Sequence, residues 1–137
     1  MPSIRGSLNN GQPLVDVLVG SVLEPHRLHA CVALVDTGCT ITGITRTVVE
    51  RLDLRHTTKT LVVTPLGEAR RKAYPFSIGF LTESDAGVAT ARSPFYFPEP
   101  VLGAEFVENS SFDILLGMDV LSKGRLLFES GRFEFAF

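Results

Sequence analysis

Short runs rich in Val, Leu, Ile and Phe recur along this chain and are separated by Gly, Pro, Asn and Ser. Runs of this kind, bounded by turn-forming residues, predict extended strands. We expect strands at residues 14–19, 28–35, 61–64, 74–81, 88–97, 113–116, 125–128 and 132–137. The last run places Phe133, Phe135 and Phe137 on one face, as in a strand with one buried side. The pattern therefore predicts an all-β domain.

Two short helices are expected, at residues 47–52 and 118–123. Thr45 is a candidate N-cap for the first, because its hydroxyl can accept a hydrogen bond from a free backbone N–H. Gly124 is expected to end the second helix in the left-handed conformation. That helix follows directly on the apolar run 114–116 and Gly117, which predicts a strand that turns sharply into a helix.

The length of 137 residues, with 45% hydrophobic and 20% charged residues, fits one globular domain with a real core. The prolines of segment 93–111, Pro94, Pro98 and Pro100, predict an edge strand that continues as an irregular excursion. We expect this excursion to belong to the domain rather than to link two domains. The predicted organisation is therefore a single domain, residues 1–137.

The formal net charge is -2, and the 13 Lys and Arg residues are spread along the chain. This distribution gives no attraction to nucleic acid or to an anionic membrane, so neither is expected as a partner. The densest basic run, residues 70–72, is interpreted as a solvated hairpin tip.

The first ten residues contain no apolar stretch like that of a signal peptide, and nowhere do about 18 apolar residues run together. We therefore expect a soluble, cytoplasmic protein. The two cysteines, Cys31 and Cys39, fit free thiols in that compartment, since a secreted domain of this size more often carries several disulfides. A bridge between the two stays open as an alternative.

An almost entirely apolar strand, residues 30–35, runs straight into Asp36, Thr37 and Gly38. Its pattern predicts burial on both faces. Burying a carboxylate is unfavourable unless it is hydrogen-bonded or serves chemistry. Thr37 can supply a hydroxyl close to the carboxylate, and Gly38 an unhindered backbone N–H. Asp36 is therefore the candidate catalytic residue.

One carboxyl group does not suffice for hydrolysis of a peptide, which needs both a base for the attacking water and an acid for the carbonyl oxygen or leaving amine. Two carboxyl groups that share one proton supply both. Residues 85–87, Asp-Ala-Gly, lack a preceding buried strand and a central hydroxyl, and are interpreted as a hairpin turn. The second carboxyl is therefore expected from another copy of the chain, in a homodimer.

The Asp-Thr-Gly segment 36–38, together with the segment 114–121 (Ile-Leu-Leu-Gly-Met-Asp-Val-Leu) about eighty residues later, resembles the retropepsin-like, or retroviral-type, aspartic peptidase family and its bacterial relatives. The resemblance spans roughly residues 14–128. It implies a closed or partly open β-barrel-like acid-protease fold with one flap hairpin, active as a homodimer. It also implies an aspartic endopeptidase that activates water between two Asp36 carboxyls, one from each subunit, on a peptide or protein substrate.

The same resemblance assigns roles to single residues. Asp36 would be catalytic, and Thr37 and Gly38 would support the catalytic loop, with Thr37 bonded across the dimer axis. The hairpin 61–80 would be the flap, with its tip at residues 65–68. The run 114–117 would cross beneath the catalytic loop. The residues assigned to substrate binding are Cys39, Thr40, Ile41, Pro65, Leu66, Gly67 and Leu116.

The sequence departs from the family at Cys39, where alanine or serine is common, and a thiol is bulkier and can be oxidised. The strand 132–137 could build a dimer sheet, as terminal strands do in some relatives. Asp119 is interpreted as a first-turn aspartate at a helix dipole rather than as a second acid. His26 and His29 have too few other ligands nearby for a zinc site, so no metal and no cofactor is expected.

Other interpretations remain. Asp36 could cap its own turn, or the fold could be a catalytically decayed peptide-binding or dimerisation module. Cys39 could be the nucleophile of a cysteine hydrolase with His26, His29 or His56 as its base, although none of these histidines has a recognisable context. A small nucleotide hydrolase would need a phosphate-cradling loop, which the sequence lacks.

Overall fold

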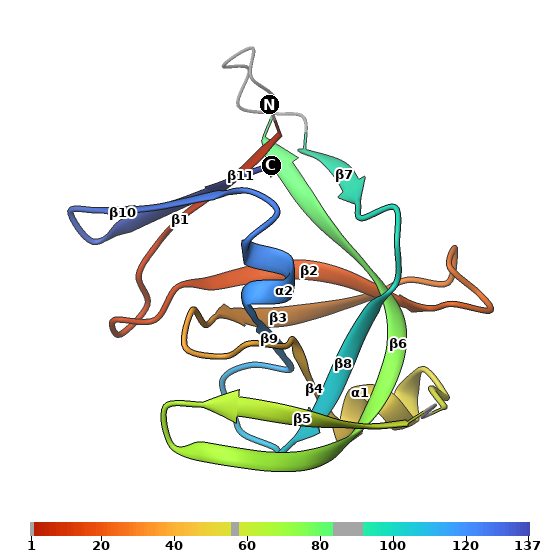
Figure 1. Ribbon diagram of the computed structural model, residues 1–137. Helices are drawn as coiled ribbons and strands as arrows, with labels where there is room; N and C mark the ends of the chain where they lie inside the picture. The colour runs from red at the N-terminus through yellow and green to blue at the C-terminus, as the bar shows by residue number, and fades with distance from the viewer. Residues whose placement is uncertain (1, 56–57, 84–91) are drawn as a thin grey trace.

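The computed structural model describes residues 2–55, 58–83 and 92–137, and its strands form one continuous sheet (Figure 1). In chain order the strands are β1 (Ser3–Ser7), β2 (Leu14–Ser21), β3 (His29–Val35), β4 (Gly43–Thr45), β5 (Thr58–Thr64), β6 (Gly67–Glu83), β7 (Arg92–Tyr96), β8 (Val101–Phe106), β9 (Ile114–Leu116), β10 (Arg125–Glu129) and β11 (Arg132–Ala136). Two short helices, α1 (Arg46–Arg51) and α2 (Met118–Leu121), complete the described part. The expected all-β class is confirmed.

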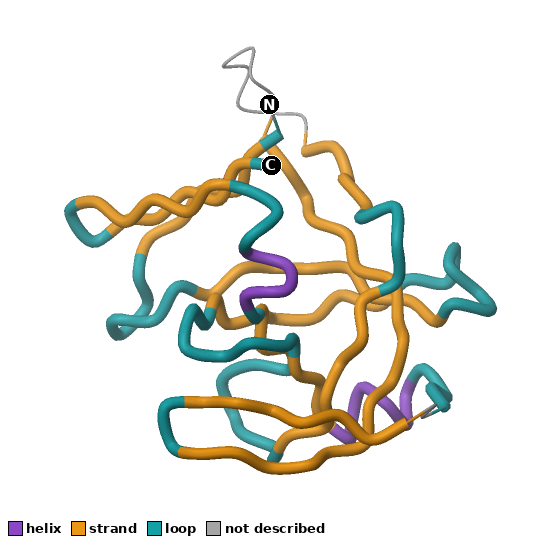
Figure 2. Tube along the Cα trace, in the orientation of Figure 1, coloured by secondary structure: helices purple, strands orange, loops and turns teal. Residues whose placement is uncertain are grey.

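The sheet closes on itself because β6 pairs with both end strands of the series β2-β3-β9-β4-β8, namely β2 and β8. The order is β10-β11-β1-β6-β2-β3-β9-β4-β8, and β8 pairs again with β6. Strand β6 spans 17 residues and uses different stretches for β5, β8, β2 and β7. The strands β6, β2, β3, β9, β4 and β8 therefore enclose a barrel, and β10, β11 and β1 extend from it as an open sheet (Figures 1 and 2).

The barrel core follows the two-residue period of its strands. On β6, Phe76, Ile78 and Phe80 are fully buried and alternate with residues that point outward. On β2, Val17 and Val19 alternate in the same way with less buried neighbours. Each of these side chains stabilises the fold by about 1.5–3 kcal/mol when it leaves water. Alternating apolar residues thus determine which strand faces line the core.

Strand β3 differs in one respect from the expectation for residues 30–35. Cys31, Ala33 and Val35 are buried, but Val32 and Leu34 on the other face are only half-buried, and Ala30 is exposed. The prediction of burial on both faces was wrong, because that second face is covered only in part. The strand nevertheless ends at Val35 against the barrel core, which places Asp36 at the barrel's edge.

Several expected boundaries change. Segment 93–111 was expected to be irregular after its first strand, but it contains β8, which begins after Pro100 and pairs with both β4 and β6. The basic run 70–72 is solvated as expected but lies within β6 and not at the hairpin tip. Of the expected strand 88–97, residues 92–96 form β7; residues 88–91 and the expected turn at 85–87 lie outside the described residues.

Both helices lie close to where they were expected. Thr45 is the N-cap residue of α1, but its side chain makes no capping hydrogen bond. Gly124 does not adopt the left-handed conformation, so that prediction was wrong. A side chain there would collide with the carbonyl oxygen of Ala136, which explains the glycine by close approach. No helix in the described ranges is long and apolar enough to cross a membrane.

Candidate active site

Asp36 stands where β3 leaves the barrel. Strands β3 and β9 are parallel, with Val35 opposite Leu116, and the Asp36 N–H donates to the carbonyl oxygen of Leu116 at 3.0 Å. The Asp36 side chain is half-buried and Thr37 is exposed. The two apolar runs singled out in the sequence are therefore neighbours, and Asp36, at their joint end, is only half-buried.

The loop after Asp36 folds back on the carboxylate. The Gly38 N–H donates to Asp36 Oδ1 at 2.9 Å, and the Cys39 N–H donates to the Asp36 carbonyl oxygen at 3.3 Å. A Cβ on Gly38 would lie 3.1 Å from Pro65 Cγ and 3.3 Å from Asp36 Oδ1. The Gly38 N–H thus lies close to the carboxylate, where the sequence placed it, and a side chain at position 38 would crowd both the carboxylate and the hairpin above it.

The run that follows β9 packs directly against this loop. A Cβ on Gly117 would lie 2.6 Å from the Ile41 carbonyl carbon and 2.9 Å from the Thr42 nitrogen. The Met118 N–H donates to the Cys39 carbonyl oxygen at 2.8 Å. Because backbone meets backbone here, only glycine fits at position 117. The loop that carries Asp36 therefore rests on a rigid support.

Asp119 fixes the far end of the same loop. Its carboxylate accepts hydrogen bonds from the Thr42 N–H at 3.1 Å and from the Thr42 hydroxyl at 2.8 Å. It also accepts the N–H of Val120 in the first turn of α2 at 2.9 Å. Both oxygens are occupied in this way, which supports the interpretation of Asp119 as a structural residue and not as a second catalytic acid.

The hairpin of β5 and β6 lies over the Asp36 loop, with its two-residue turn at Pro65 and Leu66, as expected for the tip (Figure 1). The Thr40 N–H and hydroxyl approach the Val63 carbonyl oxygen at 3.4 and 3.5 Å, which are long hydrogen bonds. The Leu66 side chain is fully exposed. The hairpin therefore covers the loop, and the two hydrogen bonds from Thr40 that join the loop to β5 are both long.

A cleft of about 340 Å³ separates the hairpin from the barrel. Its lining residues are Cys39, Ile41, Gly43, Val62, Leu66, Gly67, Glu68, Ala69, Arg71, Ala104, Glu105, Phe106 and Leu115. Thus four of the residues expected to bind substrate, Cys39, Ile41, Leu66 and Gly67, face one cleft. Of the others, Pro65 packs over Gly38 and Thr40 approaches Val63.

Leu116 does not belong to this cleft. Only 1% of its surface is exposed, and it packs in the core, while its neighbour Leu115 lines the cleft. The expectation for Leu116 was wrong by one residue, because successive side chains of a strand point to opposite faces. Phe106 of β8 also lines the cleft, and the sequence did not predict this. The reason is that segment 93–111 showed no strand pattern beyond its first residues.

Cys39 is buried, with 3% of its surface exposed. Burial raises the pKa of the thiol, and the charges of Asp36 and Asp119 raise it further. The thiol donates a hydrogen bond from Sγ to the Ile41 carbonyl oxygen at 3.0 Å. Burial likewise raises the pKa of Cys31 to about 11. Both thiols are free, as expected, and neither is activated as a nucleophile.

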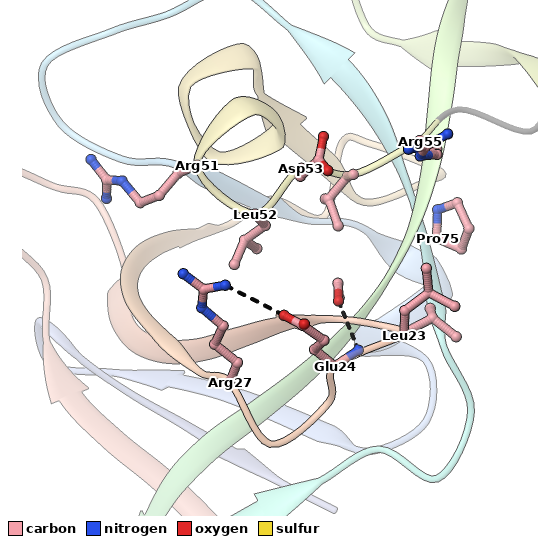
Figure 3. Close-up of a pocket in the computed structure, with 11 residues that line it drawn as sticks. Leu23, Glu24, Arg27, Arg51, Leu52, Asp53, Arg55 and Pro75 are labelled. Carbon is pink, nitrogen blue, oxygen red and sulfur yellow. Dashed lines mark hydrogen bonds and ion pairs between the residues drawn. The ribbon is translucent and has the colours of Figure 1, made fainter.

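No group of three or more His, Cys, Asp or Glu side chains in the described ranges is arranged to hold a metal ion. His26 is exposed and His29 is half-buried; His56 lies outside the described residues. A second cavity, of about 440 Å³, lies between the β2–β3 loop and the end of α1 (Figure 3). Arg27, Glu24 and Asp53 line it, and it contains none of the residues around Asp36.

Comparison with known proteins identifies the family of the chain. The sequence model of the family described as Aspartyl protease matches residues 27–120, which include Asp36 and the run from Ile114 to Val120. The match covers more than half of the chain, so the chain belongs to the aspartyl protease family. The expected membership of a retropepsin-like family is thereby supported from the sequence side. No curated protein matches the chain.

The fold is similar to that in the crystal structure of a retropepsin-like aspartic protease from Rickettsia conorii. The TM-score is 0.60 at 16% sequence identity, and the match covers 98% of this chain and 91% of that chain. At this identity the likeness establishes the fold alone. The retropepsin-like fold expected from the sequence is confirmed.

Proposed function

We propose that this chain is an aspartic endopeptidase that acts as a homodimer, with Asp36 from each subunit forming the catalytic pair. The observation that carries the proposal is the Asp36 carboxylate itself, half-buried at the end of β3 and hydrogen-bonded by the Gly38 N–H, in a chain of the aspartyl protease family. It is reachable from outside the subunit and lies beside a cleft of peptide-binding size.

The need for a second subunit follows from the other carboxylates near the site. Both oxygens of Asp119 hold Thr42 and Val120. Asp113 precedes β9 and accepts the Val32 N–H at 3.1 Å, away from the end of β3 at Val35. Neither is placed to share a proton with Asp36. A two-fold axis beside the exposed Thr37 would bring two Asp36 side chains together.

In such a pair, one carboxylate and one carboxylic acid share a single proton. The carboxylate takes a proton from a water molecule, whose oxygen bonds to the carbonyl carbon of the peptide. The acid donates its proton to the carbonyl oxygen. Proton transfer to the amide nitrogen then allows the C–N bond to break, which yields a new carboxyl and a new amino terminus. The proton that reaches the nitrogen is the one that the first carboxylate took from water, and the second carboxylate takes a proton from one hydroxyl of the tetrahedral intermediate, so the pair again holds one proton.

The substrate would be an extended peptide lying between the β5–β6 hairpin and the Asp36 loop. An extended chain presents alternate side chains to opposite sides, so every second residue would enter the cleft. The apolar walls include Ile41, Phe106 and Leu115, and charged groups of Glu68 and Arg71 also line the cleft. The long hydrogen bonds between Thr40 and Val63 would have to open to admit the peptide.

The test compares wild type with Asp36→Asn on a diverse peptide library between about pH 4 and 7, the range in which a carboxyl pair can hold one proton. Cleavage is read by mass spectrometry. We expect wild type to cut and Asp36→Asn to lose activity while keeping its fold and its oligomeric state. Asp16→Asn, a change of an exposed carboxylate on β2, is the matched control and should cut like wild type.

Specific activity should also fall on dilution, because only dimers hold both carboxyl groups. Cleavage by Asp36→Asn at the wild-type rate would refute the proposal. Peptide binding by wild type without turnover at any pH in this range would favour the decayed peptide-binding module instead.

A further inference from the structure

Strand β10 leaves one edge of the sheet unpaired. Among the described strands it pairs only with β11, whereas β11 lies between β10 and β1, and β1 between β11 and β6. The strand at 132–137, which the sequence suggested for a dimer sheet, therefore has partners on both sides within its own subunit. The free edge at this end of the sheet belongs to β10.

The exposed residues of β10 are unusual for a solvent-facing edge. Leu127 is 51% exposed and Phe128 is 48% exposed, in a strand of five residues. Exposed apolar edges invite pairing with another strand, and natural proteins usually protect them. Here the apolar residues are flanked by two exposed charged residues of opposite sign, Arg125 and Glu129.

The sequence of β10, Arg-Leu-Leu-Phe-Glu, complements itself when read in the opposite direction. In an antiparallel pair of two β10 strands centred on Leu127, each Leu127 faces its copy. Leu126 then faces Phe128 of the other strand, and Arg125 faces Glu129. Both ends of the pair carry an ion pair and its centre is apolar, which is the pattern that stabilises cross-strand neighbours.

The β10 hairpin and Asp36 lie at the same side of the subunit. The Leu8 N–H donates to the Gly131 carbonyl oxygen in the β10–β11 turn at 2.9 Å, and the Val35 N–H donates to the Pro13 carbonyl oxygen at 3.0 Å. The segment between Leu8 and Pro13 thus runs from that turn to the end of β3. In Figures 1 and 2 the hairpin, the loop after β3 and the tip of the β5–β6 hairpin reach toward the same side.

We propose that β10 is the dimerisation edge, and that it pairs antiparallel with β10 of a second copy in the register centred on Leu127. The sheet of β1, β11 and β10 then continues across the two-fold axis into the other subunit, and the contact is isologous. This inference rests on the proposed function for its partner, since the active site is incomplete without a second copy. The charge pattern of the strand itself fixes the register.

Charge reversal tests the register. In a dimer of Arg125→Glu, the new glutamate at position 125 of each copy faces Glu129 of the other copy. In a dimer of Glu129→Arg, the new arginine at position 129 faces Arg125 of the other copy. Each variant alone should weaken the dimer by roughly tenfold or more. An equimolar mixture of the two should restore dimers, because every facing pair is again opposite in sign. The double variant with both changes should dimerise like wild type. Arg55→Glu, at an exposed position in the loop that follows α1, is the matched control.

Sedimentation velocity gives the oligomeric state, and peptide cleavage is measured on the same samples. A wild type that dimerises and cuts, with single variants that do so equally well, overturns this register and leaves the proposed function standing. A wild type that is dimeric but never cuts, with charge variants that behave as predicted, supports the interface while the proposed function fails. A wild type that stays monomeric overturns the interface.

Leu127→Cys gives a second, independent measurement. Directly opposed residues in an antiparallel pair have Cα atoms about 4.5–5.5 Å apart, which a disulfide can bridge. We expect mild oxidation to link this variant into covalent dimers that a reductant separates. Val107→Cys, at a position 78% exposed after β8, should remain uncrosslinked. Equal crosslinking of both variants would contradict the proposed pairing.

Discussion

The carboxylate of Asp119 accepts hydrogen bonds from both the backbone N–H and the hydroxyl of Thr42, which lies 77 residues earlier in the chain. The Thr42 hydroxyl in turn accepts the Gly117 N–H at 3.2 Å. This small network joins the loop that follows Asp36 to the first turn of α2. The position of the candidate catalytic carboxylate therefore depends on a residue outside the Asp-Thr-Gly motif.

We predict that Asp119→Asn lowers both stability and activity. The two oxygens of Asp119 accept hydrogen bonds from two different groups of Thr42, its N–H and its hydroxyl. The asparagine amide keeps one acceptor oxygen, and its NH₂ group would face one of these Thr42 donors without an acceptor. The free energy of unfolding should fall by about 1–3 kcal/mol, the usual effect of leaving a buried polar group unsatisfied. Urea unfolding and kcat for a peptide substrate measure the two effects.

Asp16→Asn serves as the control, because Asp16 is an exposed carboxylate on β2. It should shift the free energy of unfolding by no more than about 0.5 kcal/mol. If Asp119→Asn and Asp16→Asn unfold at the same urea concentration, Asp119 does not anchor the loop.

Local pattern was enough to predict the elements whose burial alternates along the chain. The apolar run at 28–35 corresponds to β3, His29–Val35, and the alternating phenylalanines at 133 and 135 are buried in β11. In β11 the buried phenylalanines follow a two-residue period, whereas in β3 the apolar run predicted the strand but not that one of its faces is covered only in part. Asp36 was found because a carboxylate directly after such a strand needs a chemical reason.

The strands and site contacts that the sequence did not predict depend on pairing between residues that lie far apart in the chain. Strand β4 spans three residues, Gly43–Thr45, and exists because β8 and β9 pair with it. A stretch so short has no period that distinguishes a strand from a loop. The assignment of Leu116 rather than Leu115 to the cleft failed similarly, because the orientation of a three-residue strand is set by β3 and β4 around it. No local sequence pattern predicts the hydrogen bonds between Thr42 and Asp119.

A second prediction concerns Cys39, which lines the cleft close to Asp36. Its raised pKa keeps the thiol protonated at neutral pH, so it cannot serve as the nucleophile of hydrolysis. Cys39→Ala should therefore retain cleavage, with kcat/KM within about threefold of wild type, whereas Asp36→Asn should abolish it. The change removes one buried sulfur and should destabilise the protein by about 1 kcal/mol.

The pH dependence of thiol labelling tests the same point directly. Because burial and the neighbouring carboxylates oppose ionisation, native wild type should react slowly with a thiol reagent near neutral pH and faster as the pH is raised. Unfolding in urea should expose both thiols at once. Loss of cleavage in Cys39→Ala, with rapid labelling of native wild type, would instead favour a cysteine hydrolase.

The third prediction concerns Leu66, whose side chain is fully exposed at the tip of the β5–β6 hairpin and also lines the cleft. An apolar side chain that the fold leaves in water becomes buried when a bound peptide covers it. Leu66→Ser should leave the free energy of unfolding within about 0.5 kcal/mol of wild type. It should lower kcat/KM by roughly tenfold, since covering a leucine stabilises a complex by about 1.5–3 kcal/mol. Leu23→Ser, at a position 87% exposed in the β2–β3 loop, is the matched control and should change neither quantity. Equal kcat/KM values for the two variants would mean that the hairpin tip does not contact the substrate during cleavage.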